Sequence, residues 1–169
     1  MSCGGGRAEL AARFRPKLDR FADTYKDNHQ HPELSRQEMQ TAERIISHLR
    51  SEEYEVHERV GGHGVVGVFR NEKGKTVLLR ADMDALPIEE ETQLPYASKV
   101  RMHDVLEDGA IGDSPVMHAC GHDMHVATLM AAASALRASR AHWNGTLLCL
   151  FQPAKEGGGG AQAMVDDVL

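Results

Sequence analysis

The sequence predicts an α/β sandwich, in which helices pack on a β-sheet, and two observations support this prediction. Amphipathic helical segments alternate along the chain with short apolar runs of strand length, and that alternation is typical of α/β architecture. The composition is that of a globular protein, because 41% of the residues are hydrophobic and 26% are charged. The 169 residues are enough for one domain with its own hydrophobic core.

Helices in the first fifty residues are predicted from the spacing of apolar side chains. Residues 8–26 predict one helix, in which Pro16 either introduces a kink or marks the true start. The stretch from Ser35 to Glu38 has the pattern of a capping box, so Ser35 is expected to cap the next helix. The apolar stripe of that helix consists of Met39, Ala42, Ile45, Ile46 and Leu49.

Strands are predicted where apolar runs are bounded by turn residues. We expect strands at residues 54–60 and 65–70, and a buried strand in the run KTVLLRAD at 75–82. The run GTLLCLFQ at 145–152 predicts a second buried strand. Residues 84–118 lack clear periodicity, and a loop of that length is usually functional or wrongly assigned.

The second half of the chain predicts two further helices. Asp123 is expected to cap a helix from about Met124 to Ser139. Four glycines then lead into a helix at residues 161–169, which has neither a C-cap glycine nor a polar tail. This ending predicts a truncated product.

Charge and hydropathy argue against several classes of function. The net charge is -6 and the basic residues are scattered, which argues against nucleic acid or an anionic membrane as the main partner. The longest apolar stretch, VATLMAAASAL, is too short to span a bilayer, and no charged-then-apolar leader opens the chain. We therefore expect a cytoplasmic protein. Its three cysteines have no spacing that suggests a disulfide framework.

Two segments combine residues that are suited to metal chemistry. Asp82 and Asp84 are two positions apart at a strand end, where both side chains would point the same way and repel each other unless a cation or a shared proton intervenes. The alternative is a solvated strand end. In MHACGHDMH, Cys120 and His122 are suitable ligands for zinc and similar metals, and the neighbouring histidines could bind or orient. A buried cysteine beside ordinary histidines is the alternative.

A third segment, QPAKEGGGGAQ, places Lys155 and Glu156 before four glycines. A phosphate loop would have its lysine after the glycines, so the residue order excludes that reading. A bare turn stays open. A carboxylate at a strand end, in a chain that also offers Cys-x-His and Asp-x-Asp, favours a metal ligand.

Four motifs in this order, HPELS, RADMDALPIEEET, HACGHDMH and FQPAKEGGGGAQAM, resemble the amidohydrolase branch of the aminoacylase-like metallopeptidases. This branch includes hippurate hydrolases, N-acyl-amino-acid amidohydrolases and auxin-conjugate hydrolases. The resemblance implies a three-layer α/β sandwich with a mixed sheet, like the zinc exopeptidases. It also implies that residues 1–28 form an N-terminal helix and that residues 29–169 form the first part of an incomplete catalytic domain. The dimerisation domain, the second part of the catalytic domain and two further ligand histidines would lie beyond Leu169.

The same resemblance implies the site residues and the substrate. Cys120 would bridge two divalent ions, zinc or manganese, with His122 and Glu156 as further ligands, and Asp84 would orient the centre. The substrate would be an N-acyl amino acid or a related small conjugate, and full-length relatives of this kind are homo-oligomeric. The family usually has a glutamate, the general base, at the position of Lys155, and often an arginine where Gly157 stands.

The lysine leaves two functional hypotheses open. A lysine is normally protonated at neutral pH, although burial and a nearby dication lower its pKa, so that Lys155 would be a neutral base. On this hypothesis the chain is the first part of a metal-dependent amidohydrolase. On the other, it is a catalytically inactive remnant or a metal-binding module.

Overall fold

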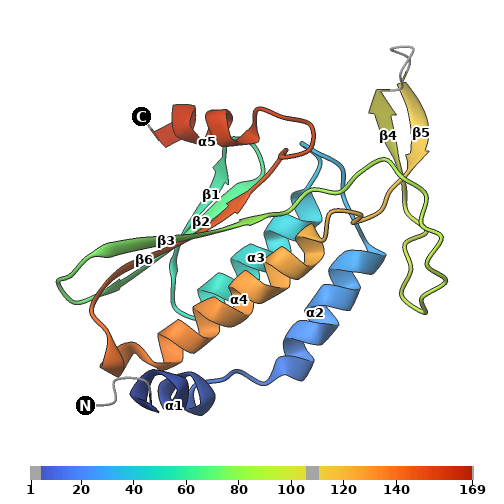
Figure 1. Ribbon diagram of the computed structural model, residues 1–169. Coiled ribbons are helices and arrows are strands. Elements are labelled where there is room, and N and C mark those ends of the chain that lie inside the picture. The colour runs from blue at the N-terminus through green and yellow to red at the C-terminus, as the bar shows by residue number, and fades with distance from the viewer. Residues whose placement is uncertain (1–4, 106–110, 169) are drawn as a thin grey trace.

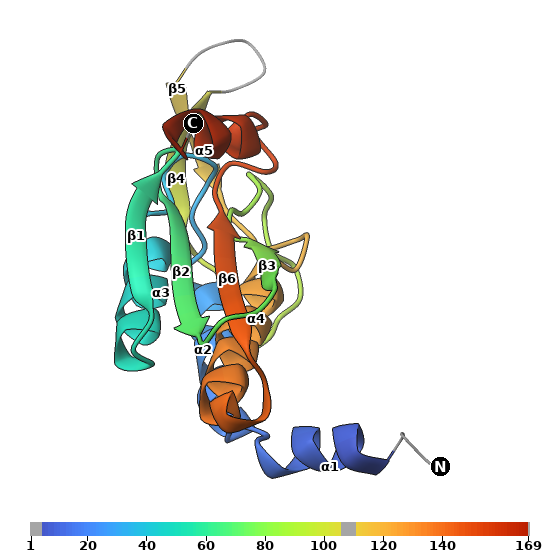
Figure 2. The same ribbon diagram turned by 90° about the vertical axis from the view of Figure 1, so that its left-hand side faces the viewer.

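The computed structural model describes residues 5–105 and 111–168, and its centre is a four-stranded mixed sheet of order β1-β2-β6-β3 (Figures 1 and 2). β1 (Glu55–Val60), β2 (Gly64–Asn71) and β6 (Gly145–Gln152) are antiparallel neighbours. β3 (Thr76–Asp82) runs parallel to β6. A parallel pair needs a crossover connection, and a helix provides it here. The predicted α/β class is confirmed.

Three helices cover one face of this sheet (Figures 1 and 2). They are α2 (Leu18–Gln30), α3 (Met39–Ser51) and the crossover helix α4 (His122–Ala138). Helix α5 (Gly160–Val168) lies on the opposite side, at one end of the sheet, as Figure 1 shows. Helix α1 (Gly5–Arg13) precedes α2 at the far end of the molecule.

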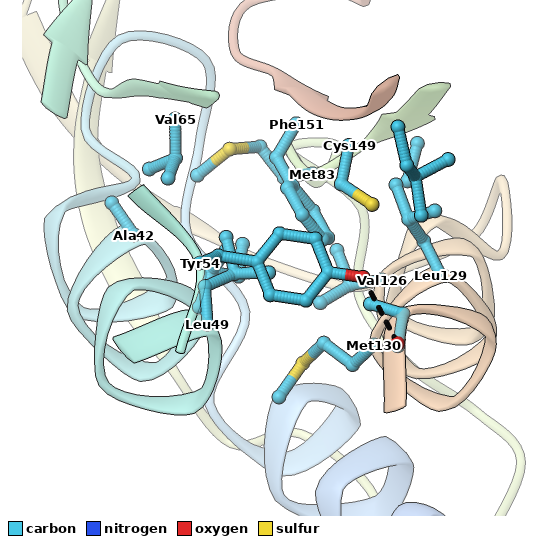
Figure 3. Packing of buried hydrophobic residues seen from close by; sticks show 14 of the residues in the cluster. Ala42, Leu49, Tyr54, Val65, Met83, Val126, Leu129, Met130, Cys149 and Phe151 are labelled. Carbon is cyan, nitrogen blue, oxygen red and sulfur yellow. Dashed lines mark hydrogen bonds between the residues drawn. The ribbon is translucent and has the colours of Figure 1, made fainter. Parts of the chain in front are cut away.

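The hydrophobic core lies between the sheet and α3 and α4 (Figure 3). In β6, residues Leu147, Cys149 and Phe151 alternate toward this core and are almost fully buried, as the period of two in a strand requires. Tyr54 enters the core with its ring, and its hydroxyl donates a hydrogen bond to the carbonyl oxygen of Ala133 at 3.0 Å. The core is therefore packed with apolar groups, and the buried Tyr54 hydroxyl has a hydrogen-bond partner.

Two predicted helix starts are wrong, for the same physical reason. Ser35 does not cap α3, because its hydroxyl is hydrogen-bonded to Asp84. The amides at the start of α3 are instead accepted by the buried carboxylate of Glu33, which lies 2.8 Å from the amide nitrogen of Thr41. Asp123 is not the N-cap of α4, which is Gly121; its Oδ1 accepts the Met124 amide in the first turn at 2.8 Å, and its Oδ2 is paired with His29. Both cap-like side chains have distant partners.

The single helix predicted at residues 8–26 is two helices. Helix α1 ends at Arg13 and α2 begins at Leu18, with Pro16 in the break. Proline lacks the amide hydrogen that a continuous helix needs, so Pro16 neither kinks a single helix nor begins it, but lies in the break between two helices.

Two strand predictions also need correction. The run at 75–82 is a strand, β3, but it lies at an edge of the sheet, and Val77 and Leu78 are about half exposed at 54% and 51%. The region 84–118 contains a hairpin of β4 (Arg101–Val105) and β5 (Ile111–Pro115). No helix among the described residues is long and apolar enough to cross a membrane.

Candidate metal centre

The parallel pairing of β3 with β6 positions the candidate site. Asp82, the last residue of β3, is in register with Gln152, the last residue of β6. The segments that follow the two strands therefore leave the sheet side by side. One carries Asp84 and the other carries Lys155 and Glu156. Helix α4, which connects the strands, begins with His122 at the same end of the sheet.

Asp84 is buried, at 1% exposure, and links the two segments. Its Oδ2 accepts hydrogen bonds from the Ser35 hydroxyl at 2.6 Å and from the Glu156 amide at 2.8 Å. Burial raises the pKa of Asp84, but hydrogen bonds from His122, Ser35 and the Glu156 amide outweigh it, and the net pKa is lowered. Asp84 is therefore a carboxylate at neutral pH.

His122 is oriented by the backbone of Asp84. Its Nδ1 donates to the carbonyl oxygen of Asp84 at 2.7 Å, so Nε2 is the nitrogen left with a lone pair in the neutral ring. This Nε2 lies 3.5 Å from Oε1 of Glu156. Burial lowers the pKa of His122, but the neighbouring Asp84 raises it by more. A ring held through one nitrogen with the other presented to a site is the usual arrangement of a histidine ligand.

Glu156 gathers the remaining predicted residues around its side chain. The Lys155 ammonium donates to Oε1 at 2.8 Å, and the exposed Cys120 thiol also donates to this carboxylate. The hydrogen bond from Lys155, followed by that from Cys120, lowers the pKa of Glu156. In return, the bond to Glu156 raises the pKa of Lys155, which is thus an ammonium here, and the pKa of Cys120, which is a thiol.

The residues that the resemblance assigns to the site, Asp84, Cys120, His122, Lys155 and Glu156, thus lie at one place, and further candidates lie close by. Ligand atoms of Asp82, His122 and His125 lie within 4.8 Å of one another, close enough to share one ion. Asp82 is also paired with Arg80 at 2.8 Å, so a neighbouring cation relieves the repulsion expected beside Asp84. The sequence had paired Asp82 with Asp84 as a candidate for metal chemistry and had given His125 as a possible ligand or orienting residue.

His118 is buried beside these groups, at 4% exposure. Among the described residues, neither of its ring nitrogens has a hydrogen-bond partner. Burial lowers the pKa of His118 to about 4, so the ring is neutral near pH 7. Thiol, imidazole and carboxylate donors together suit a divalent transition metal, and unpartnered buried polar atoms beside them are consistent with a site that holds an ion.

The glycine run is needed for a close approach at Gly157. Its amide donates to the Ser35 hydroxyl at 2.8 Å, and a Cβ added at Gly157 would lie 2.8 Å from the Ser35 Cβ. In this conformation the position excludes a side chain, including the arginine that the family often has there. Ser35 was predicted as a helix cap; its contact with the site, 122 residues away along the chain, has no local signal.

The mixed α/β sheet carries carboxylates just after two parallel strands, and a thiol and an imidazole stand at the start of the helix that connects them, an arrangement typical of metal-dependent hydrolases. Comparison with known proteins is consistent with this class. The chain belongs to peptidase family M20/M25/M40, whose model matches residues 78–169. This confirms the family resemblance of the four motifs.

Individual relatives are consistent with this family. Over 142 residues the chain is 45% identical to a hippurate hydrolase of Campylobacter jejuni, covering 83% of this chain and 33% of the relative. It is 38% identical to an N-acetylcysteine deacetylase of Bacillus subtilis, covering 87% of this chain and 36% of that protein. The solved YXEP protein of Bacillus subtilis, a dinuclear metal-binding peptidase from the M20 family, superimposes with a TM-score of 0.77 at 36% identity, covering 93% of this chain and 40% of the other. The chain thus spans about a third to two fifths of the relatives it matches.

Proposed function

We propose that the chain forms the metal-binding part of an amidohydrolase that cleaves the amide bond of N-acyl amino acids or related small conjugates. One observation carries the proposal. The donor groups of Cys120 and His122, at the start of α4, converge with that of Glu156, which follows β6, and His122 presents its Nε2 toward Glu156. The names of the relatives, a hippurate hydrolase and an N-acetylcysteine deacetylase, support the choice of amide substrate.

Two divalent ions, zinc or manganese, would be held by Cys120, His122 and Glu156 on this proposal, with Cys120 as the shared ligand. Asp82 and His125 stand close enough to complete the donor set. The ions would supply Lewis acidity toward water and the amide carbonyl. The role of Asp84 is to orient the centre. Its side chain accepts a hydrogen bond from the Glu156 amide, and its backbone oxygen accepts one from the His122 ring.

Lys155 stands at the general-base position. To act there, the lysine must be neutral, accept a proton from the attacking water at Nζ and return it to the leaving amine as the C–N bond breaks. Its ion pair with Glu156 opposes this, because that contact raises the pKa of Lys155. We therefore propose that the chain turns over slowly, and that a carboxylate at this position would restore the base.

A hydrolysis assay with N-acetyl- and N-benzoyl-amino acids tests this function. We expect turnover that a chelator abolishes and that Cys120→Ala removes. Cys149→Ala is the matched control, since Cys149 is 0% exposed and packs in the hydrophobic core and not with the candidate ligands. Lys155→Glu should raise the rate by about 10²–10⁴-fold, the usual value of a general base. A rate that is insensitive to chelator would refute the proposal.

A metal-binding module without catalysis is the second candidate, and the ion pair between Lys155 and Glu156 favours it. Such a protein would bind Zn²⁺ or Mn²⁺, as measured by calorimetry, yet show no turnover and no gain with Lys155→Glu. The two candidates therefore differ in the response to a single substitution.

We propose further that residues 29–169 form the first part of the catalytic domain and that the chain acts in the cytoplasm. The share of the relatives that the chain spans supports the first point. The second is supported by Cys120, which must remain a free thiol to bind metal, as it does in a reducing compartment.

A further inference from the structure

A buried charged cluster at the start of α4 consists of His29, Asp123 and Glu90. His29 ends α2, Asp123 is the second residue of α4, and Glu90 belongs to the segment between β3 and β4. The side chains are 7%, 2% and 0% exposed. This cluster, named here the histidine clasp, joins three segments that are distant in sequence.

Both ring nitrogens of His29 contact carboxylates. Nδ1 lies 2.6 Å from Oδ2 of Asp123, and Nε2 lies 3.0 Å from Oε1 of Glu90. A neutral imidazole has one N–H and would turn a lone pair toward one of these carboxylates, so the geometry requires a doubly protonated ring. Burial lowers the pKa of His29, but the hydrogen bonds that its ring donates to Glu90 and Asp123 raise it by more, which agrees with an imidazolium.

Glu90 in the clasp is held by further hydrogen bonds, and aromatic rings surround His29. Glu90 also accepts hydrogen bonds from the Thr92 hydroxyl and, at 2.5 Å, from the Ser98 amide, so its carboxylate is fixed by its own loop. The rings of Tyr25 and Tyr96 pack against His29, with centroids 5.7 and 5.5 Å away. Aromatic walls limit access of water, and low polarity strengthens the two ionic hydrogen bonds.

At the start of α4 the Asp123 carboxylate has two contacts: its Oδ1 accepts the Met124 amide at 2.8 Å, and its Oδ2 contacts His29. The N-cap of α4 is Gly121, which has a φ of 77° and no side-chain hydrogen bond of its own. Glycine has greater backbone conformational freedom than any other residue. His122 is the first residue of the helix and Asp123 is the next. The contact that fixes Asp123 therefore also fixes the backbone from which the His122 ring extends.

We propose that His29 is a positioning residue that acts through Asp123 to set the direction of His122 at the metal centre. This inference rests on the metal-binding role proposed for His122. It assigns to the clasp a function in ion affinity beyond its contribution to folding.

Zn²⁺ titration by calorimetry tests the inference, with His29→Gln compared with His48→Gln. His48 is a matched control, because it is also buried and also contacts α4, through a 3.0 Å bond to the carbonyl oxygen of Met130, two turns beyond the ligand. We expect His29→Gln to weaken Zn²⁺ binding about 10–100-fold, the usual effect of losing a group that orients a ligand, and His48→Gln to change it less than twofold. Equal effects of the two variants would overturn the proposal. Glu90→Gln, which keeps the shape of the clasp, should give a smaller loss and serves if His29→Gln does not fold.

Ring NMR of the metal-free protein separates this inference from the proposed function. We expect two N–H signals from His29 and, in the His29→Gln variant, a changed His122 spectrum, whereas His48→Gln leaves His122 unchanged. If the wild type binds no Zn²⁺ and these spectra appear as expected, the proposed function fails while the positioning contact stands. An unchanged His122 spectrum in His29→Gln would overturn the inference whatever the metal affinity.

Discussion

The core beneath the sheet and the polar cluster at the strand ends are both buried, but they are stabilised in different ways. In the core, Phe151 and Ile45 are fully enclosed by apolar neighbours, and the Tyr54 hydroxyl has a partner. At the strand ends, buried carboxylates and imidazoles are paired with each other, and several atoms, including both ring nitrogens of His118, have no partner among the described residues.

This difference separates stability from function. Core packing depends on shape and on apolar area, which solution conditions change little. The polar cluster depends on protons and cations, because each buried charge there needs a counter-charge. Substitutions in the core should therefore change the free energy of unfolding and leave ion affinity intact, whereas changes at the strand ends should respond to pH and to metal.

The largest effect is expected from Phe151→Ala. Phe151 is 0% exposed between the sheet and the helices, and loss of such a ring costs about 3–5 kcal/mol in unfolding free energy. Urea denaturation measures this cost, and Zn²⁺ affinity of the folded fraction should stay within twofold. Phe151→Leu, which fills more of the space, should cost clearly less. A variant as stable as the wild type would show that the core is not packed as described.

A second prediction concerns His118 and the pH dependence of stability. Its pKa is lowered from 6.5 to about 4 by burial. Between these values the unfolded chain binds a proton that the folded chain does not, so the folded state loses stability as pH falls, by roughly 3 kcal/mol in total. Above pH 6.5 the histidine contributes nothing to this slope.

His118→Leu removes that titration and should flatten the stability curve between pH 6.5 and 4, as measured by urea denaturation at a series of pH values. His29 in the clasp gives a pH dependence of stability with the opposite sign. The pKa of His29 is raised, so its contribution is present below the ordinary value and is lost as pH rises through the folded pKa. An unaltered acid slope in His118→Leu would contradict the prediction.

Much of the fold could be predicted from local pattern. Apolar runs bounded by turn residues predicted β2 and β6, and the stripe through Ile45 and Leu49 predicted α3, because both patterns report which side chains are buried. The gathering of Cys120, His122 and Glu156 could be expected from their motifs, since strand ends and helix starts meet at one edge of an α/β sheet.

The sequence could not predict which side chains would form hydrogen bonds with residues far away along the chain. Ser35 and Asp123 have the local signature of helix caps, but they also contact Asp84 and His29, which lie 49 and 94 positions away and which no local pattern indicates. Glu33, which does satisfy the start of α3, belongs to no local capping pattern. Edge position was equally hidden: the apolar run of β3 looks buried until the strand order is known.

A smaller effect is expected from Ser35→Ala. Its hydroxyl donates to Asp84 and accepts from the Gly157 amide, so the substitution leaves two polar groups short of a partner. A lost buried hydrogen bond of this kind costs about 1–3 kcal/mol, and the loop after β6 should become more mobile. Thermal denaturation and amide hydrogen exchange at Gly157 measure the two consequences. Ser35→Thr keeps the hydroxyl and should retain most of the stability; if it behaves like Ser35→Ala, the hydroxyl is not what holds the loop.

The smallest change in stability, with a distinct change in behaviour, is expected at the exposed edge. Val77 in β3 is 54% exposed and lines an apolar groove of about 280 Å³ with Leu79 and Trp143. An edge strand with free backbone groups and apolar side chains is prone to pair with another chain, and a lysine on it opposes this. Val77→Lys should alter unfolding free energy by only about 0.5 kcal/mol, as is usual for surface positions, and should reduce concentration-dependent association in sedimentation velocity. Lys75→Arg, which keeps the charge of the same edge, should leave association unchanged. A wild-type chain that stays a compact monomer at all concentrations would show that the edge is already protected.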